Sequence, residues 1–167
     1  ERVEDMESKC GHLQFPLFVK PVKAGDSLGI TEQSLTQTPD ELRRSVAETI
    51  AAYDAALVEA FIPGREFTVL VVADPDPGNP PLAFRPLEFV FPEGNTFKTY
   101  DLKITQWHPE CNIPCSDPNL DASLRAAATR IFKAFEGVGY ARLDFRVDPA
   151  GEIFFLEINF ACSVFYP

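Results

Sequence analysis

Near its C-terminal end the chain alternates apolar and polar residues with the period of two that is typical of β-strands. Two runs, Ala141–Val147 and Ile153–Asn159, are rich in β-branched and aromatic residues. The segment between them, Asp148–Gly151, contains proline and glycine, which favour a turn. The pattern therefore predicts a β-hairpin.

The alternation also predicts which side chains share a face of this hairpin. Because successive side chains of a strand point to opposite faces, Arg142, Asp144 and Arg146 lie on one face of the first strand. On the second strand the odd-numbered residues from Ile153 to Asn159 share one face, and the even-numbered residues between them share the other. Each strand is therefore expected to have one polar and one apolar face near its end.

Three polar side chains are expected to meet at the end of the hairpin that lies away from the turn. Strand pairing would bring Asp144, Glu157 and Asn159 together there. Two carboxylates and an amide oxygen are hard ligands suited to Mg²⁺, which usually binds substrate phosphates as well. The hairpin therefore predicts a magnesium site for a nucleotide, and the alternative is a polar face that meets only solvent.

The remaining periodicity predicts two helices and several further strands. One helix begins with Thr38 as its N-cap and ends near Ala52, and another begins between Asp117 and Asp121 and ends near Glu136. Their apolar stripes are Leu42, Val46, Ile50 and Tyr53 in the first helix, and Leu124, Ala128, Ile131, Phe132 and Phe135 in the second. The further strands are Phe15–Pro21, Ala56–Ile62, Arg65–Ala73 and Leu82–Phe91, with Thr99–Trp107 as strand or extended loop and His108–Pro118 as irregular. This order predicts an α+β fold with mainly antiparallel sheets and helices on one face.

Two connections between these strands have the chemistry of a nucleotide site. The loop Lys23–Gly29 contains two glycines and a serine, so its backbone N–H groups could cover phosphates, although an ordinary hairpin turn would look the same. Glu59 and Glu66 flank the Pro63-Gly64 turn. That arrangement suits a hinge where backbone groups meet adenine and a carboxylate accepts the ribose hydroxyls, and the alternative is two exposed glutamates at strand edges.

Composition restricts the class of protein further. The 167 residues carry a net charge of −10, which argues against nucleic acid as a partner, and their 46% apolar content is enough for a core. No run approaches the roughly 18 apolar residues of a membrane helix. Four cysteines do not form a disulfide scaffold, which indicates a reducing, cytoplasmic compartment. The chain does not begin with methionine, so we expect a fragment of a longer chain, with residues 1–14 as a linker or disordered end.

Several motifs, in order, resemble the ATP-grasp superfamily and most closely the ATP-binding C-terminal region of D-alanine–D-alanine ligases. They are FPLFVKP, GDSLGI, LVEAFIPGREFTV, TYDLK, and GYARLDFRV with FFLEIN, and they extend from Phe15 to Asn159. The resemblance implies one ATP-grasp domain, with a small lobe at 15–64, a large lobe with the metal site at 65–167, and the nucleotide between the lobes. Flanking helices would cover the sheets.

The resemblance also implies roles for individual residues. ATP would be bound by Lys20, Gly25, Ser27, Gly29, Glu59, Ile62, Glu66 and Lys103. Lys103 would reach the β- and γ-phosphates, and Arg142 would steady the phosphate and the tetrahedral intermediate, so both are implied to be catalytic. Mg²⁺ or Mn²⁺, two ions in the family, would be held by Asp144, Glu157 and Asn159.

The implied activity is ATP-dependent ligation of a carboxylate to an amine through an acyl phosphate, with a small carboxylate or amino acid as substrate and no protein nucleophile. The sequence departs from the family at the substrate side. Phe160–Ser163 replaces the Pro-Gly that usually follows the metal-site asparagine, and Ala24, Asp26, Ala60 and Ile104 are also unusual. These departures leave open a catalytically silent ATP-binding domain that regulates or scaffolds a partner.

A separate hypothesis is a structural zinc site. The candidate ligands are Cys10, His12, His108, Cys111 and Cys115. Their spacings are loosely compatible with Zn²⁺, but they do not form paired CxxC motifs, and free cysteines are often simply buried.

Overall fold

The computed structural model describes residues 9–25, 27–76, 78–100, 111–160 and 162. The chain forms two compact units, one of Glu1–Phe61 with Phe97–Trp107 and the other of Ile62–Thr96 with His108–Pro167. The division into a small nucleotide-binding lobe at 15–64 and a large lobe with the metal site at 65–167 stays a prediction.

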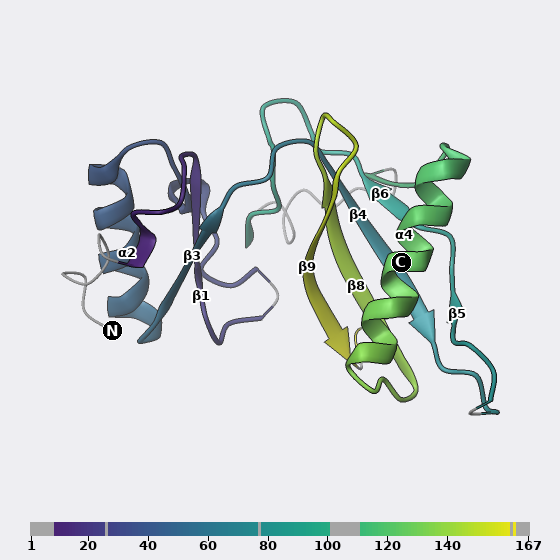
Figure 1. Ribbon diagram of the computed structural model, residues 1–167. Coiled ribbons are helices and arrows are strands. Elements are labelled where there is room, and N and C mark those ends of the chain that lie inside the picture. The colour runs from purple at the N-terminus through teal and green to yellow at the C-terminus, as the bar shows by residue number, and fades with distance from the viewer. Residues whose placement is uncertain (1–8, 26, 77, 101–110, 161, 163–167) are drawn as a thin grey trace. The chain divides into compact units, whose positions relative to one another are not determined.

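The first unit is built on β1 (Leu17–Pro21), the central strand of a three-stranded antiparallel sheet. Its neighbours are β2 (Leu35–Thr36), which follows the short 3-10 helix η2 (Glu32–Ser34), and β3 (Ala56–Ala60). The helix α2 (Pro39–Tyr53) packs against this sheet through a core of Leu17, Val19, Leu42 and Val46, with Cys10 and Leu13 packed at its edge (Figure 1). Because side chains alternate along β1, Lys20 lies on the face opposite this core.

The predicted start of α2 is confirmed. The hydroxyl oxygen of Thr38 accepts a hydrogen bond from the backbone N–H of Glu41 at 3.3 Å. The Glu41 carboxylate in turn accepts one from the backbone of Gln37 at 2.6 Å. Reciprocal bonds of this kind satisfy N–H groups that have no partner within the helix. Pro39 occupies the first turn, where its missing N–H costs nothing.

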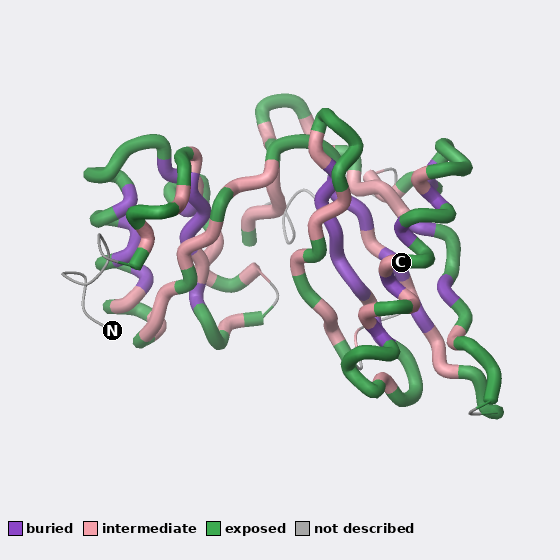
Figure 2. Tube along the Cα trace, in the orientation of Figure 1, coloured by how far each residue is buried: buried purple, intermediate pink, exposed green. Residues whose placement is uncertain are grey.

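The second unit is an antiparallel sheet with one helix on one face. The strand order is β7 (Asn112–Pro114), β6 (Leu87–Phe89), β4 (Arg65–Val72), β8 (Tyr140–Val147) and β9 (Ile153–Phe160), and β5 (Leu82–Ala83) pairs with β4. The helix α4 (Pro118–Ala134) buries Leu124, Ala128 and Phe132 against Phe67, Val69, Val71, Leu143, Phe145 and Val147. Figure 2 shows this burial concentrated along β4 and β8. The predicted α+β class with antiparallel pairing is therefore confirmed.

Three details of the predicted elements are wrong. Leu82–Phe91 is not one strand, because buried Pro86 separates β5 from β6 and a proline cannot donate to a ladder. The predicted irregular segment contains the short strand β7. Phe135 was assigned to the buried stripe, but α4 ends at Ala134 and the Phe135 side chain is 56% exposed.

The hairpin of β8 and β9 contains a bulge that the alternation of residue types does not reveal. Asp144 pairs with Glu157 and Phe145 pairs with Phe155, so Leu156 has no partner in the ladder. Directly paired residues share a face, so Phe155 lies on the face of Phe145, and their ring centroids are 5.9 Å apart. The prediction that Ile153 and Phe155 share a face with Glu157 and Asn159 is therefore wrong. The predicted meeting of Asp144 with Glu157 is confirmed.

Gly64, in the turn between β3 and β4, is expected to tolerate no side chain. Its φ is +113°, and a Cβ atom there would collide with the backbone carbonyl oxygen of Val147. Gly151 in the hairpin turn also has a positive φ, +88°, but faces open space. Both alanine substitutions incur roughly 1–2 kcal/mol for the left-handed backbone, and Gly64→Ala adds an overpacking cost of about 1–3 kcal/mol. Urea denaturation of the two variants measures the difference, and equal midpoints would contradict it.

Candidate functional site

The candidate site lies on the face of the second sheet opposite α4. The residues of β4, β8 and β9 that alternate with the core residues point to this face. The ladder aligns Thr68 with Asp144 and Asp144 with Glu157, and in the next polar pair it aligns Arg142 with Asn159. Three strands therefore contribute polar side chains to one patch, although Thr68 and Asp144 are 76 residues apart in the chain.

Asp144 is the centre of this patch. Its side chain is almost fully buried, and Oδ1 accepts a hydrogen bond of 2.7 Å from the Thr68 hydroxyl. The guanidinium of Arg142 lies alongside, with Nε 3.1 Å from Oδ1 and Nη2 3.1 Å from Oδ2. Charge-assisted hydrogen bonds of this kind are stronger than neutral ones, and they fix the orientation of the carboxylate. Arg142 is therefore held beside the carboxylate rather than extended into solvent.

Asn159 connects the two carboxylates. Its side-chain Nδ2 donates to Glu157 Oε1 at 2.8 Å and lies 3.4 Å from Asp144 Oδ2. Both carboxylates therefore lie next to the Nδ2 atom of Asn159. A half-turn of the amide group would place Oδ1 there instead. A divalent cation in that position would have two carboxylate oxygens and one amide oxygen as ligands, a donor set that fits Mg²⁺.

The residues that the structure describes contain no group of three or more His, Cys, Asp or Glu side chains that could hold a metal ion. The candidate donor set therefore depends on the asparagine amide as its third member. Of the zinc hypothesis, His108 lies outside the described residues. Cys10 and His12 belong to the first unit and Cys111 and Cys115 to the second, and buried Cys115 donates through Sγ to the Asp117 carbonyl oxygen at 3.6 Å. Nothing in the described residues supports a zinc site.

A second ion pair lies next to this patch, and its arginine was not assigned a role from the sequence. Arg146 is 4% exposed, and its Nη1 lies 3.3 Å from Oε2 of buried Glu66. Its Nη2 donates to the Gly64 carbonyl oxygen at 3.0 Å. Burial lowers the pKa of Arg146, while the neighbouring Glu66 opposes that change. In the sequence, the only indication that Arg146 belongs to the site was that it shares a strand face with Asp144.

In the first unit the predicted lysine and glutamate form an ion pair. Lys20 Nζ on β1 lies 2.8 Å from Glu59 Oε1 on β3, and both side chains are partly exposed. The pair lies on the sheet face opposite α2, because the alternating residues of β1 pack against that helix. Partly exposed ion pairs contribute little stability, so Lys20 can exchange Glu59 for another anion at low cost.

The predicted phosphate loop is a succession of tight turns. Leu28 N–H donates to the Gly25 carbonyl and Ile30 N–H to the Ser27 carbonyl, each at 3.0 Å. Gly29 has a φ of +78°, and a Cβ atom there would meet the ring of Tyr53 at 2.7 Å, so glycine is required. Ile62, two residues after the end of β3, is partly buried. Lys103, Asp26 and Ser163 lie outside the described residues, so the structure does not place them.

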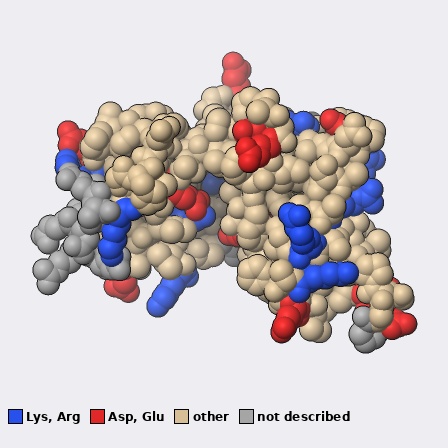
Figure 3. All heavy atoms as spheres, in the orientation of Figure 1, with Lys and Arg blue, Asp and Glu red and all other residues tan. Residues whose placement is uncertain are grey.

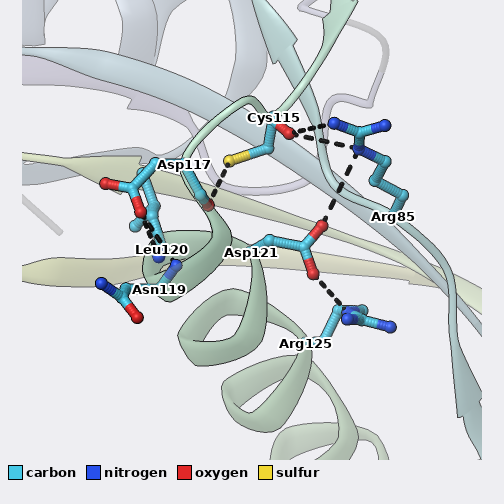
Figure 4. Close-up of polar contacts among 7 residues, drawn as sticks. All are labelled: Arg85, Cys115, Asp117, Asn119, Leu120, Asp121 and Arg125. Atoms are coloured by element: carbon cyan, nitrogen blue, oxygen red, sulfur yellow. Dashed lines mark hydrogen bonds and ion pairs between the residues drawn. The ribbon is translucent and has the colours of Figure 1, made fainter.

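Figure 4 shows a polar network at the start of α4. It lies on the side of the sheet where α4 packs, opposite the Asp144 patch. The Asp117 carboxylate caps the helix by accepting from the backbone of Asn119 at 2.8 Å. Asp121 Oδ1 lies 2.6 Å from Arg125 Nε one helical turn later. Arg85, between β5 and β6, donates to the Cys115 carbonyl oxygen at 2.7 Å and lies 4.0 Å from Asp121, so it connects these two strands to the start of α4. These contacts stabilise the scaffold and do not reach Asp144.

A surface cavity of about 580 Å³ lies beside α4. It is lined by Pro81, Leu82, Ala83, Arg125, Ala126, Thr129, Arg130 and Lys133. Figure 3 shows basic side chains gathered over this part of the second unit. Because α4 packs on the core face, this cavity is separate from the polar patch around Asp144.

In the described residues, no helix is long and apolar enough to cross a membrane.

Known proteins resemble this chain in both sequence and fold. The profile of the family described as "D-ala D-ala ligase C-terminus" matches residues 1–162. A D-alanine--D-alanine ligase of Psychrobacter sp. (strain PRwf-1) is 30% identical over 156 residues, which are 93% of this chain and 44% of that protein. A D-alanine--D-alanine ligase of Syntrophotalea carbinolica is 36% identical over 152 residues, which are 90% of this chain and 46% of that protein. The chain thus spans less than half the length of these curated relatives.

Solved structures agree with the sequence comparison. VanG D-Ala:D-Ser ligase from Enterococcus faecalis matches with a TM-score of 0.69 and 26% identity over 93% of this chain and 43% of that chain. The D-alanine-D-alanine ligase from Coxiella burnetii has a TM-score of 0.66 at 24% identity, over 95% of this chain and 39% of that chain, which shows a common fold. The predicted ATP-grasp fold and the predicted resemblance are confirmed. The chain belongs to the D-ala D-ala ligase C-terminus family.

Proposed function

We propose that this chain is the ATP-binding part of a ligase that joins a carboxylate to an amine through an acyl phosphate. The observation that carries the proposal is the convergence of Asp144, Glu157 and Asn159, with Arg142 beside them, on one sheet face. The family membership adds support, since the relatives compared above are ligases. Nothing among them favours a catalytically silent regulatory domain.

The metal-binding role falls to Asp144, Glu157 and Asn159. Mg²⁺ or Mn²⁺ held there would neutralise the phosphate charge that develops during transfer. Thr68 would keep Asp144 oriented, because its hydroxyl bonds the carboxylate at 2.7 Å. Arg142 would move from Asp144 toward the transferred phosphate once a cation takes over the carboxylate's charge. Lys103 is the second proposed catalytic cation.

The remaining proposed contacts concern the nucleotide. Lys20 would bind its α- and β-phosphates, and Gly25, Ser27 and Gly29 would cover them. Glu59 and the backbone of Ile62 would meet adenine, and Glu66 the ribose hydroxyls. Lys20 is paired with Glu59 at 2.8 Å, so phosphate would compete with a carboxylate that holds the lysine in place.

The proposed substrate that is joined in the reaction is a small amino acid. The relatives named for D-alanine make a small amino acid the first substrate class to test. ATP and such a substrate are the proposed partners, and the cytoplasm is the proposed location. No nucleic acid or membrane partner is proposed.

Removing the divalent metal is expected to weaken ATP binding by at least about 10-fold. Without a cation, the triphosphate would face the Asp144 and Glu157 carboxylates across a short distance, and like charges repel. Isothermal titration of the intact protein with ATP, in Mg²⁺ and then in EDTA, measures this change. Excess Mn²⁺ should restore the affinity because it favours the same oxygen ligands. Equal affinities with and without metal would contradict the metal site.

The activity itself is tested by ADP formation from Mg-ATP when D- and L-amino acids are supplied to the intact protein, both singly and in pairs. A ligase releases ADP only when its acid and amine substrates are present. ATP binding with no ADP release on any supplied amino acid would reject the ligase and leave a silent nucleotide-binding domain.

A further inference from the structure

Arg146 of β8 and Glu66 of β4 form an ion pair in the interior of the second unit. The two residues are directly opposite in the β4–β8 ladder, and both side chains are at least nine-tenths buried. Arg146 Nη1 lies 3.3 Å from Glu66 Oε2, and Nη2 donates to the Gly64 carbonyl oxygen at 3.0 Å. The guanidinium carbon is 5.9 Å from the Phe91 ring centroid, within range of a cation–π contact.

Such a pair is costly to bury unless its geometry is well satisfied. Two anchors on one planar group, Glu66 and the Gly64 carbonyl, fix the guanidinium relative to the start of β4. The Glu66 carboxylate opposite is then restricted to few rotamers. A carboxylate that is already oriented accepts hydrogen bonds from hydroxyl groups without first losing side-chain entropy.

We propose that Arg146 is a positioning residue that orients Glu66 to accept hydrogen bonds from the ribose hydroxyls of ATP. This inference rests on the proposed function, in which Glu66 contacts the ribose. Arg146 acts through Glu66 and makes no contact with the nucleotide itself. The alternative is an ion pair that only stabilises the pairing of β4 with β8. It predicts no effect on the preference for a nucleotide with ribose hydroxyls.

The discriminating measurement is the affinity of the intact protein for Mg-ATP relative to 2′,3′-dideoxy-ATP. Wild type is expected to favour ATP by roughly 10-fold or more, because the analogue lacks both hydroxyl donors. In Arg146→Met the affinity for ATP should fall toward that for the analogue, while the affinity for the analogue stays within about 2-fold of wild type. Glu66→Gln should reduce the same ratio, and the double variant should add little to either single change.

Two further variants make the result interpretable. Arg65→Met is the matched control, because Arg65 is adjacent to Glu66 but pairs with Glu88 at 2.6 Å from the other face of β4. It should leave the ratio unchanged. Arg146→Lys keeps a cation and should retain part of the preference for ATP, which keeps the test valid if the methionine variant does not fold.

The outcomes separate this inference from the function on which it rests. Wild type that binds neither nucleotide would overturn the proposed function. Wild type that binds both equally would overturn the ribose role of Glu66 and the inference with it. Arg146 variants that lose affinity for both nucleotides in the same proportion, or that keep the wild-type ratio, would show a purely structural pair and overturn the inference alone.

Discussion

Replacement of Glu157 by glutamine is expected to lower the turnover of ATP by at least about 100-fold in the intact protein. The substitution keeps the shape of the side chain and removes one of the two carboxylate charges that converge on Asn159. Electrostatic groups aimed at developing charge are typically worth about 100- to 1,000-fold in rate. Asp144→Asn should have an effect at least as large, because that carboxylate is more deeply buried and also accepts from Thr68 and Arg142. Steady-state ADP release measures both variants.

Glu152→Gln is the matched control for this experiment. Glu152 directly precedes β9, five residues before Glu157, and its side chain is exposed at the turn end of the hairpin. The same change of charge there should leave turnover within about 2-fold of wild type, because Glu152 lies at the turn end of the hairpin, away from Asp144 and Asn159, and solvent and salt screen its charge over that distance. If Glu157→Gln and Glu152→Gln had similar turnover, the metal-site assignment would be wrong.

The hairpin shows both what the sequence could predict and where it could not. Turn residues and β-branched runs identified both strands, and their antiparallel pairing was enough to bring Asp144 opposite Glu157. The alternation rule failed at Leu156, because a bulge leaves one residue unpaired and reverses the face of every residue beyond it. An apolar leucine between Phe155 and Glu157 fits either face, so residue types contain no signal of the bulge.

The partners of the site residues were less predictable than the residues themselves. Thr68 and Glu66 meet Asp144 and Arg146 only because β4 lies beside β8 in the sheet. That neighbour relation depends on the packing of several strands under α4, and no local pattern specifies it. For the same reason the sequence marked Glu66 as a ribose contact but gave no indication that an arginine would be buried against it.

The scaffold under the site is expected to depend strongly on Phe145. Phe145 of β8 is fully buried in the core that β4, β8 and α4 form, and it follows Asp144 directly, at the position of the bulge. Phe145→Ala should lower the free energy of unfolding by about 3–5 kcal/mol, because it removes buried apolar surface and leaves a cavity in a close-packed core. The total free energy of unfolding of a typical protein is about 5–15 kcal/mol, so the expected loss is a large fraction of it.

Phe155→Ala supplies the control, because Phe155 lies opposite Phe145 with ring centroids 5.9 Å apart but is 39% exposed. Both variants lose the contact between the rings, which is worth about 0.5–1.5 kcal/mol, and only Phe145→Ala also creates an internal cavity. Urea denaturation followed by far-ultraviolet circular dichroism should therefore place the Phe145→Ala midpoint well below that of Phe155→Ala at a similar slope. Coincident midpoints would mean that the core beneath Asp144 relaxes to fill the space, and that the site is not held by the packing of β8 against α4.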